Sequence, residues 1–348
     1  MREGSMHKGY RIHRWGEDPA WEEFPVPAPG QGEVLVEVEA CGVGLTVLNC
    51  IRGDLADDPE LLPRVPGHEL VGRVTRAGPG TRSDLVGRRV TAYFYLSCGL
   101  CRECVAGRES RCLRLRGWVG VHVDGGYAPT AVIPSFNAIP ISEELDPVDA
   151  TTVPDAVATP VHVCGTRAGV GPEDRVAVIG AGGGVGIHMI QVAALHGAEV
   201  AGLDVTEEKL GAIEDLGARP ADSRDFSALD AGALWSMGPP TVVIDLVGSS
   251  ESLGWSRDAL GPGGRLVVLT TFRDRTLEVD PRQMVFREVS ITGSRYASRA
   301  EVSTAAKLVA SGRVRPMIGE TVGPDGVPAL HDALRCGEML GRGALAWR

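Results

Sequence analysis

Apolar residues in the first part of the chain occur in short runs that alternate with polar residues. Residues 33–39 alternate polar and apolar side chains, and 71–75, 89–95 and 127–133 are β-rich runs separated by glycine and proline. Alternation with a period of two is typical of strands that bury one face. The pattern predicts a β-rich domain up to about residue 150, without a long helix.

From about residue 160 onward, apolar strand-like runs alternate with helical patterns. The predicted strands lie at 176–179, 200–203, 241–247, 264–270 and 289–292. Thr206 is expected to cap a helix over 207–216, and Ser298 with Glu301 forms a capping box that opens a helix over 302–311. Strands that alternate with helices are typical of a doubly wound parallel sheet, so the predicted fold class is α/β.

A glycine-rich turn follows the strand 175–179 and precedes an apolar helical pattern over 185–195. The turn consists of Gly180, Ala181, Gly182, Gly183, Gly184, Val185 and Gly186. Glycines let the backbone turn sharply and approach a pyrophosphate, which free N–H groups and the positive end of the helix bind. Val185 stands where the strict pattern has its third glycine, so the spacing is a G-x-x-G-x-x-G variant.

The next predicted strand ends at Asp204, 18 residues after Gly186. This is about the offset at which a carboxylate accepts hydrogen bonds from an adenosine ribose, so the combination predicts dinucleotide binding. No Arg or Lys stands between Asp204 and Lys209. Because a 2′-phosphate would be repelled and left unpaired there, NAD(H) is expected rather than NADP(H).

Composition narrows the class of partner. The 348 residues carry a net charge of -10 and no clustered basic segment, which argues against nucleic acid. A leader-peptide pattern and an 18-residue apolar span are both missing from the sequence, so we expect a cytosolic chain that acts on a small molecule. Its eight cysteines should then be reduced, and a local cluster of them indicates a metal site before a disulfide.

Four of the cysteines form such a cluster. Cys98, Cys101, Cys104 and Cys112 have the spacing C-x2-C-x2-C-x7-C. Four closely spaced thiolates suit tetrahedral zinc in a closed site, where the ion is structural because no position remains for a substrate. An iron–sulfur cluster or four unrelated buried thiols are the alternatives.

Together these features resemble the zinc-containing medium-chain dehydrogenase/reductase family, of the alcohol dehydrogenase type. The resemblance rests on the four-cysteine segment, the signature Gly67-His68-Glu69-Leu-Val-Gly72, and the segments 25–36, 174–186, 243–248 and 262–268. It implies a GroES-like domain from residues 1–158 and 294–348, with a structural zinc lobe at about 96–114, and a Rossmann domain at 159–293. It also implies a homodimer or homotetramer that pairs through the edge strand near 289–293.

The resemblance assigns roles to several further residues. Arg342 falls where family members place an arginine on the cofactor phosphates; the alternative is a solvated surface arginine. In the family a loop C-G-V-C-x-T-D-x-H supplies a metal-ligating cysteine, a hydroxyl for the substrate alcohol, an acidic group and a histidine that relays the proton. Here Gly44, Val47 and Asn49 replace the cysteine, the acid and the histidine, and Thr46 is retained.

His68, Glu69 and Asp155 match the remaining ligand positions, so a catalytic zinc would have His68 and Asp155 as protein ligands with Glu69 or water. Other thiols and imidazoles are expected to be ordinary packed or surface residues: Cys41, Cys50, Cys164, His122, His162 and His188. The catalytic zinc is therefore predicted to be absent or weakly held, and the changes at Gly44 and Val47 predict a roomier and less polar site.

Three functions remain open from the sequence. The first is a reductase without a firmly held catalytic zinc, which transfers hydride to an activated C=C, C=O or C=N bond while Thr46, His68 or water handles the proton. The second is a zinc alcohol dehydrogenase with an unusual ligand set. The third is a dinucleotide-binding protein without turnover.

Overall fold

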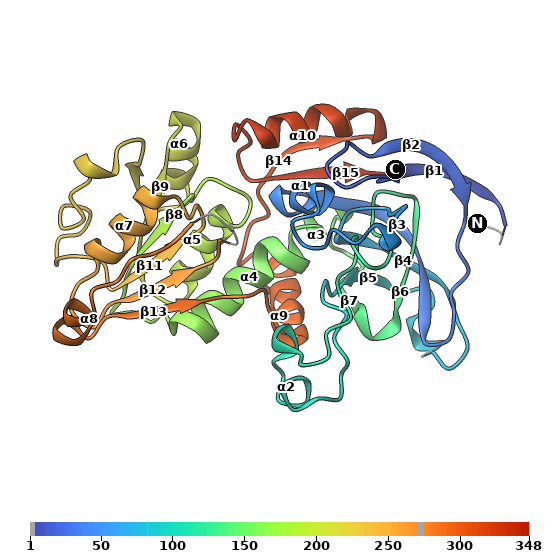
Figure 1. Ribbon diagram of the computed structural model, residues 1–348, viewed down its shortest axis with the longest axis horizontal. Coiled ribbons are helices and arrows are strands. Elements are labelled where there is room, and N and C mark those ends of the chain that lie inside the picture. The colour runs from blue at the N-terminus through green and yellow to red at the C-terminus, as the bar shows by residue number, and fades with distance from the viewer. Residues whose placement is uncertain (1–3, 82, 271–274, 348) are drawn as a thin grey trace. The chain divides into compact units, whose positions relative to one another are not determined.

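The computed structural model describes residues 4–81, 83–270 and 275–347. The chain divides into two compact units, which we call the β-rich unit and the α/β unit (Figure 1). The β-rich unit combines the segment that ends at Ala158 with Ala297–Gly312 and the segment that begins at Pro316. The α/β unit consists of Thr159–Tyr296 and Arg313–Arg315.

The β-rich unit is built on a seven-stranded sheet and a two-stranded hairpin. The hairpin pairs β1 (Met6–Arg11) with β2 (Ala20–Pro25). The sheet has the order β14-β15-β3-β4-β5-β7, with β6 also paired to β3. Its strands are β3 (Glu33–Val43), β4 (Glu69–Ala77), β5 (Arg89–Ala92), β6 (Thr130–Pro134), β7 (Ala138–Pro140), β14 (Ile318–Val322) and β15 (Arg342–Ala346).

The pairing of β15 with β3 brings the C-terminal segment to the start of the chain. The two strands run antiparallel, with Gly343 opposite Val43 and Ala344 opposite Gly42. This register brings Arg342, which precedes Gly343, beside Gly44, which follows Val43. An interaction between these two positions is set by strand register, which no local sequence pattern records.

Helices in the β-rich unit are mostly short. They are α1 (Leu45–Arg52), α2 (Arg102–Val105), α3 (Pro147–Ala150), α9 (Arg299–Ala310) and α10 (Val327–Arg335), with a π-helical turn at Val153–Val157. At the start of α9, the Ser298 hydroxyl accepts from the Glu301 N–H and the Glu301 carboxylate accepts from the Ser298 N–H. The predicted capping box is therefore confirmed.

The α/β unit contains a six-stranded parallel sheet of the order β10-β9-β8-β11-β12-β13 (Figure 1). The strands are β8 (Arg175–Ile179), β9 (Glu199–Asp204), β10 (Arg219–Asp222), β11 (Val242–Asp245), β12 (Arg265–Val268) and β13 (Ser290–Gly293). The helices are α5 (Gly186–Leu195), α6 (Glu207–Asp215), α7 (Ser250–Ala259) and α8 (Pro281–Arg287), and α4 (Ala158–Val161) stands where the chain passes between the units in sequence. The order reverses between β8 and β11, as in a doubly wound fold, and the predicted fold class is confirmed.

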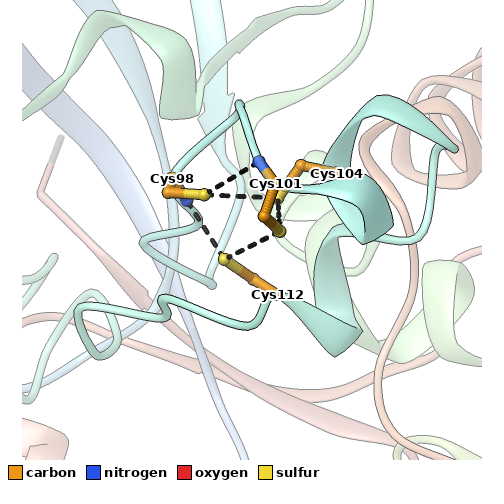
Figure 2. Close-up of side chains that lie close together, drawn as sticks. All are labelled: Cys98, Cys101, Cys104 and Cys112. Carbon is orange, nitrogen blue, oxygen red and sulfur yellow. Dashed lines mark hydrogen bonds between the residues drawn. The ribbon is translucent and has the colours of Figure 1, made fainter.

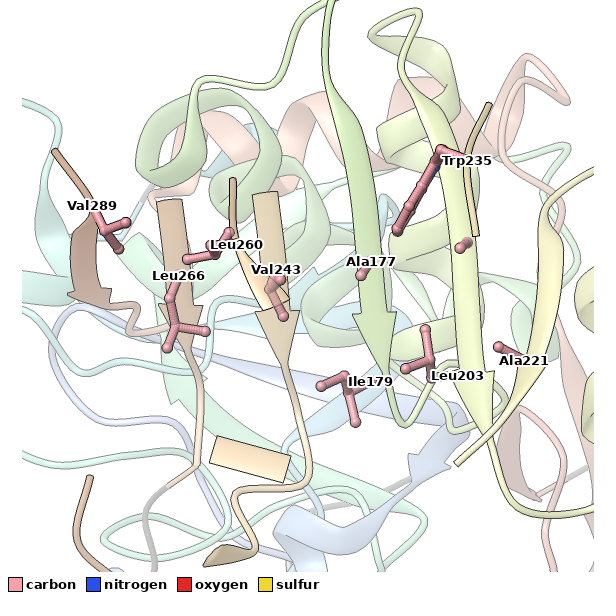
Figure 3. Close-up of a cluster of buried hydrophobic side chains, with 10 residues drawn as sticks. Ala177, Ile179, Leu203, Ala221, Trp235, Val243, Leu260, Leu266 and Val289 are labelled. Carbon is pink, nitrogen blue, oxygen red and sulfur yellow. The ribbon is translucent and has the colours of Figure 1, made fainter. Parts of the chain in front are cut away.

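Alternate residues of the central strands form one face of the α/β core. Ala177 and Ile179 of β8 pack with Leu203, Val243 and Leu266 from neighbouring strands (Figure 3). The intervening Val176 and Val178 are also buried. Strands buried on both faces are typical of parallel sheets covered by helices, which explains their continuous apolar runs.

Among the described strands, the sequence prediction missed β1, β2, β7, β14 and β15 in the β-rich unit and one strand, β10, in the α/β unit. β10 has the sequence Arg-Pro-Ala-Asp and pairs with β9 alone among the described strands. An edge strand has a strand partner on one side only, so it tolerates proline and charged residues. A strand of four residues with one proline and two charged residues therefore has little apolar pattern to detect. Within the described part of the chain, no helix is long and apolar enough to cross a membrane.

Candidate active site and metal centres

The glycine-rich turn connects β8 to α5, as predicted. Gly180 has a positive φ of 77° and, with Ala181, donates its N–H to the Leu203 carbonyl of β9. A Cβ added at Gly186 would lie 2.1 Å from the Gly180 carbonyl oxygen, and one at Gly182 would lie 2.5 Å from Lys209. Gly186 thus permits a close backbone approach at the start of α5, although its place in the motif is shifted.

Asp204 stands at the end of β9 beside this turn and is buried. Its carboxylate accepts from the N–H groups of Gly182 and Val205, both at 2.8 Å. The Lys209 ammonium lies 3.8 Å from the same carboxylate and is also buried. Lys209, in the first turn of α6, is a charged neighbour of Asp204 that sequence reasoning missed; its five-residue offset from Asp204 was the available signal.

The four-cysteine cluster is brought together in a lobe of the β-rich unit that contains α2 (Figure 2). The Sγ–Sγ distances are 3.5 Å for Cys101 to Cys104, and 3.9 Å for both Cys98 to Cys104 and Cys101 to Cys112. A tetrahedral ion with Zn–S bonds of about 2.3 Å requires sulfur atoms about 3.8 Å apart. The geometry therefore fits zinc, and all four residues are free thiols.

Backbone N–H groups point at these sulfur atoms. Cys101 N donates to Cys98 Sγ, Cys98 N to Cys112 Sγ and Arg114 N to Cys112 Sγ, at 3.3–3.4 Å. Hydrogen bonds from the backbone, first from Leu100, lower the pKa of Cys98 to about 6. Stabilised thiolates are the form that ligates a metal.

A second group of possible ligands lies in the interior of the β-rich unit. His68 precedes β4, Glu69 begins it, and Asp155 lies on the π-helical turn. One ligand atom from each lies within 4.8 Å of the others, and His68 Nε2 is 3.3 Å from Asp155 Oδ2. The His68 ring packs against Phe94, with centroids 4.3 Å apart. The structure thus brings these three predicted residues together.

Arg342 joins this group as a fourth member, which the sequence did not reveal. Its Nε donates to Glu69 Oε2 at 2.7 Å, and its Nη2 lies 2.6 Å from the same oxygen and 3.5 Å from Asp155 Oδ2. The alternative of a solvated surface arginine is wrong, because Arg342 is only 4% exposed. Its contact with a cofactor phosphate stays a prediction.

The electrostatics of the group are dominated by burial. Burial lowers the pKa of Arg342, but attraction to Glu69 and Asp155 outweighs it and the net shift is upward, so the guanidinium stays charged. Burial raises the pKa of Glu69, and Arg342 opposes that rise. A buried cation next to two carboxylates satisfies charges that would otherwise be costly to bury.

The side chain of Arg342 fills the space that Gly44 leaves. A Cβ added at Gly44 would lie 2.2 Å from Nη1 and 2.3 Å from Cζ of Arg342. The prediction of a roomier and less polar site at Gly44 is therefore wrong, since a charged group fills that room. Val47 is buried, and the Asn49 amide oxygen accepts from Arg52 on the exposed side of α1.

A catalytic zinc ion would be opposed by this arrangement. Both candidate carboxylates are already paired with Arg342, and the ion would share a buried space with a guanidinium. Two like unit charges about 4 Å apart repel by about 4 kcal/mol at an effective dielectric constant of about 20, and a divalent ion would face about twice that. Among the described residues, no cysteine joins this group to supply a compensating thiolate.

The other thiols do not join the group among the described residues. Cys41, Cys50 and Cys164 are buried, and burial raises the pKa of each, to about 12 for Cys50 and Cys164. Of the histidines, His122 Nδ1 accepts from Trp118 N, and His188 Nδ1 lies 2.6 Å from the Gly184 carbonyl. Thr46, the second residue of α1, is partly exposed.

Comparisons with known proteins identify the family of the chain. Residues 30–143 match the model of the alcohol dehydrogenase GroES-like domain, and residues 184–311 match that of the zinc-binding dehydrogenases. An alcohol dehydrogenase of Geobacillus stearothermophilus is 32% identical, over 92% of this chain and 93% of its own. An acryloyl-coenzyme A reductase of Sulfurisphaera tokodaii is 28% identical, over 92% and 95%. The crystal structure of AibC superimposes with a TM-score of 0.90 at 31% identity, over 99% and 96%.

The chain belongs to the zinc-type medium-chain dehydrogenase/reductase family, and the resemblance drawn from the sequence is confirmed. It is an NAD(P)-dependent oxidoreductase with a GroES-like and a Rossmann fold. The two relatives described above are named for different reactions, alcohol dehydrogenation and acryloyl-coenzyme A reduction.

Proposed function

We propose that this protein is an NADH-dependent reductase of an activated double bond, C=C, C=O or C=N, that works without a catalytic zinc. The observation that carries the proposal is the pairing of Arg342 with Glu69 Oε2 and Asp155 Oδ2, which puts a cation beside both carboxylates that a metal would need. The name of the acryloyl-coenzyme A reductase relative supports an activated C=C bond as the acceptor.

An activated acceptor explains how such a site manages without a metal. Oxidation of a simple alcohol passes through an alkoxide-like state, whose charge a Lewis acid can stabilise. Hydride addition to a bond conjugated with a carbonyl or thioester instead spreads the charge over the acceptor itself. The protein then supplies orientation, exclusion of water and one proton.

The proton for the reduced product comes from Thr46, His68 or water. His68 is held in place by Phe94 on its ring and by Asp155 at Nε2. Thr46 is partly exposed on α1 and offers a hydroxyl. One hydride from the cofactor and one proton from this source complete the reduction of the double bond.

Cys98, Cys101, Cys104 and Cys112 would hold one structural zinc ion. All four ligand positions are filled by thiolates, so the ion would fix the lobe around α2 and take no part in hydride transfer. NADH is preferred over NADPH, because the Asp204 carboxylate at the end of β9 would repel a 2′-phosphate, and the Lys209 ammonium 3.8 Å away offsets only part of that repulsion.

A zinc-dependent alcohol dehydrogenase is the second candidate. It is favoured by the 4.8 Å grouping of His68, Glu69 and Asp155 and by the name of the Geobacillus relative. It would require Arg342 to leave its carboxylate partners. Membership in an oxidoreductase family gives no support to the third interpretation, a protein without turnover.

The test combines metal counting with a substrate panel. The purified protein is treated with a mild chelator, its zinc content is measured, and NADH oxidation is followed with an unsaturated thioester, an enone, an imine and a simple ketone. We expect turnover of an activated acceptor with about one zinc per chain and little oxidation of simple alcohols. Alcohol oxidation that rises and falls with a second zinc ion would refute the proposal.

A further inference from the structure

We propose that the Arg342 guanidinium, in the space that Gly44 leaves open, takes the place of a catalytic metal ion. Substitution of both residues should then reopen the site to zinc. The inference rests on the proposed function in one respect, the absence of a catalytic zinc in the natural chain. It goes further by naming the residue pair that excludes the ion.

Gly44 is required for space, since its backbone conformation is open to any residue. Its φ of -143° and ψ of 179° are those of extended backbone. The Cβ of any other residue would lie 2.2 Å from Arg342 Nη1, far inside the shortest contacts that Cβ atoms make. The buried guanidinium can therefore occupy its position only because residue 44 has no side chain.

Arg342 supplies the charge that the site needs. The Glu69 side chain is fully buried and that of Asp155 is 13% exposed, and both carboxylates face the guanidinium. Buried carboxylates without a counter-charge are strongly destabilising. In a metal-binding site an ion from solution provides the counter-charge, whereas here the Arg342 side chain provides it.

The guanidinium is held firmly. β15 pairs with β3 in a fixed register, so the Cα of Arg342 cannot move away from Gly44 without breaking the sheet. Two atoms of the guanidinium, Nε and Nη2, contact Glu69 Oε2. A zinc ion must displace this side chain before it can approach His68 and Asp155.

Neither substitution should be sufficient alone. Gly44→Cys adds a thiol but leaves the cation, and the thiol's Cβ collides with it. Arg342→Met removes the cation but leaves one imidazole and two carboxylates, a set that holds zinc less well than one with a thiolate. Gly44→Cys with Arg342→Met provides a thiolate, an imidazole and a carboxylate with a fourth position open, as in catalytic zinc sites.

The experiment counts zinc in folded protein after mild chelation. We expect about one zinc per chain in the natural protein and in each single variant, and about two in the double variant. In the matched control, Arg89→Met replaces Arg342→Met. Arg89 is suitable because it also pairs with a carboxylate of the same unit, Glu39, at 2.7 Å. Gly44→Cys with Arg89→Met should stay at about one.

A stability cycle tests the steric part without metal and covers the case in which Arg342→Met does not fold. Gly44→Ala should lower the Tm by several degrees in the natural chain, and most of that loss should vanish in an Arg342→Lys background, because lysine keeps the charge but lacks the planar fork. Equal losses in both backgrounds would overturn the inference.

The two proposals fail in different ways. A folded double variant with about one zinc overturns the inference and leaves the proposed function standing. A second zinc in Gly44→Cys alone also overturns it, since Arg342 would then not exclude the ion. A second zinc in the natural protein, lost in His68→Ala, would overturn both.

Discussion

At the scale of single residues, each unit depends on a buried carboxylate beside a cation. In the α/β unit, Asp204 accepts two backbone N–H groups and lies 3.8 Å from the Lys209 ammonium. In the β-rich unit, Glu69 lies 2.6 Å from Arg342. Removing one member of such a pair costs more than the pair contributes, because the other charge stays buried.

Asp204→Ser should weaken NADH binding and reduce the preference for NADH over NADPH. The serine hydroxyl removes the negative charge that repels a 2′-phosphate, and it accepts fewer hydrogen bonds. Fluorescence titration of both cofactors measures the effect, and Asp222→Ser, an aspartate on the neighbouring strand β10 that pairs with Arg224, serves as the control. A natural protein that binds NADPH about tenfold more tightly, by about 1.4 kcal/mol, would contradict this assignment.

His331 should make the fold sensitive to acid. Its Nε2 lies 2.9 Å from the Tyr127 hydroxyl, and burial, with Arg335 second, lowers its pKa from 6.5 to about 4. The unfolded chain therefore binds a proton at higher pH than the folded one. Stability from the neutral imidazole is complete above pH 6.5 and is lost as the pH falls towards about 4.

The corresponding variant is His331→Gln. Between pH 7 and pH 4 the free energy of unfolding of the natural protein should fall by up to about 3 kcal/mol more than that of the variant. Urea unfolding at several pH values measures it. His13→Gln, at an exposed position, should keep the natural pH profile; identical profiles for His331→Gln and the natural protein would rule out this role.

At the scale of elements, the cysteine lobe contains little regular structure. Its helix α2 has four residues, and Leu100, Val105 and Leu113 around it are exposed apolar side chains. A segment of this kind buries too little apolar surface to order itself. A metal held by four thiolates would provide the missing free energy.

Cys101→Ser should remove most of the zinc, and His68→Ala should change the zinc content little. The natural protein should hold about one zinc per chain, because the four-thiolate site keeps its ion through purification. Elemental analysis gives the count, and limited proteolysis should cut near 98–112 in Cys101→Ser before it cuts the natural chain. Retention of zinc in Cys101→Ser would place the ion elsewhere.

At the scale of the whole molecule, the sheet of the α/β unit ends in an edge that a second copy could extend. β13 pairs with β12 alone among the described strands. Val285 and Phe286 on the neighbouring α8 are each more than 70% exposed. An unpaired edge flanked by exposed apolar side chains is a typical protein–protein interface.

The natural protein should therefore sediment as a dimer or tetramer at micromolar concentration. Phe286→Asp should shift it towards the monomer, because the charge would be buried in the interface. Met237→Asp, at an equally exposed apolar position of the same unit, should leave the mass unchanged. A monomeric mass for the natural protein in analytical ultracentrifugation would exclude this assembly.

The sequence by itself determined the elements whose signals are local. Alternating or continuous apolar runs predicted β3, β4, β8, β9, β11 and β12, because burial on one or both faces dictates those periods. The glycines of 180–186 and the four cysteines are also local, since a tight turn and a small tetrahedral site each require nearby residues. Membership in the dehydrogenase family followed from these segments.

Only the tertiary structure decided what occupies the site at Gly44. Arg342 reaches Glu69 and Asp155 through the pairing of β15 with β3, across hundreds of residues of sequence. The substitution at Gly44 suggested an empty space, because a sequence shows which side chain is missing at a position but not which distant side chain fills it. Strand register, packing and the need to neutralise two buried carboxylates decide that, and they exist only in the folded chain.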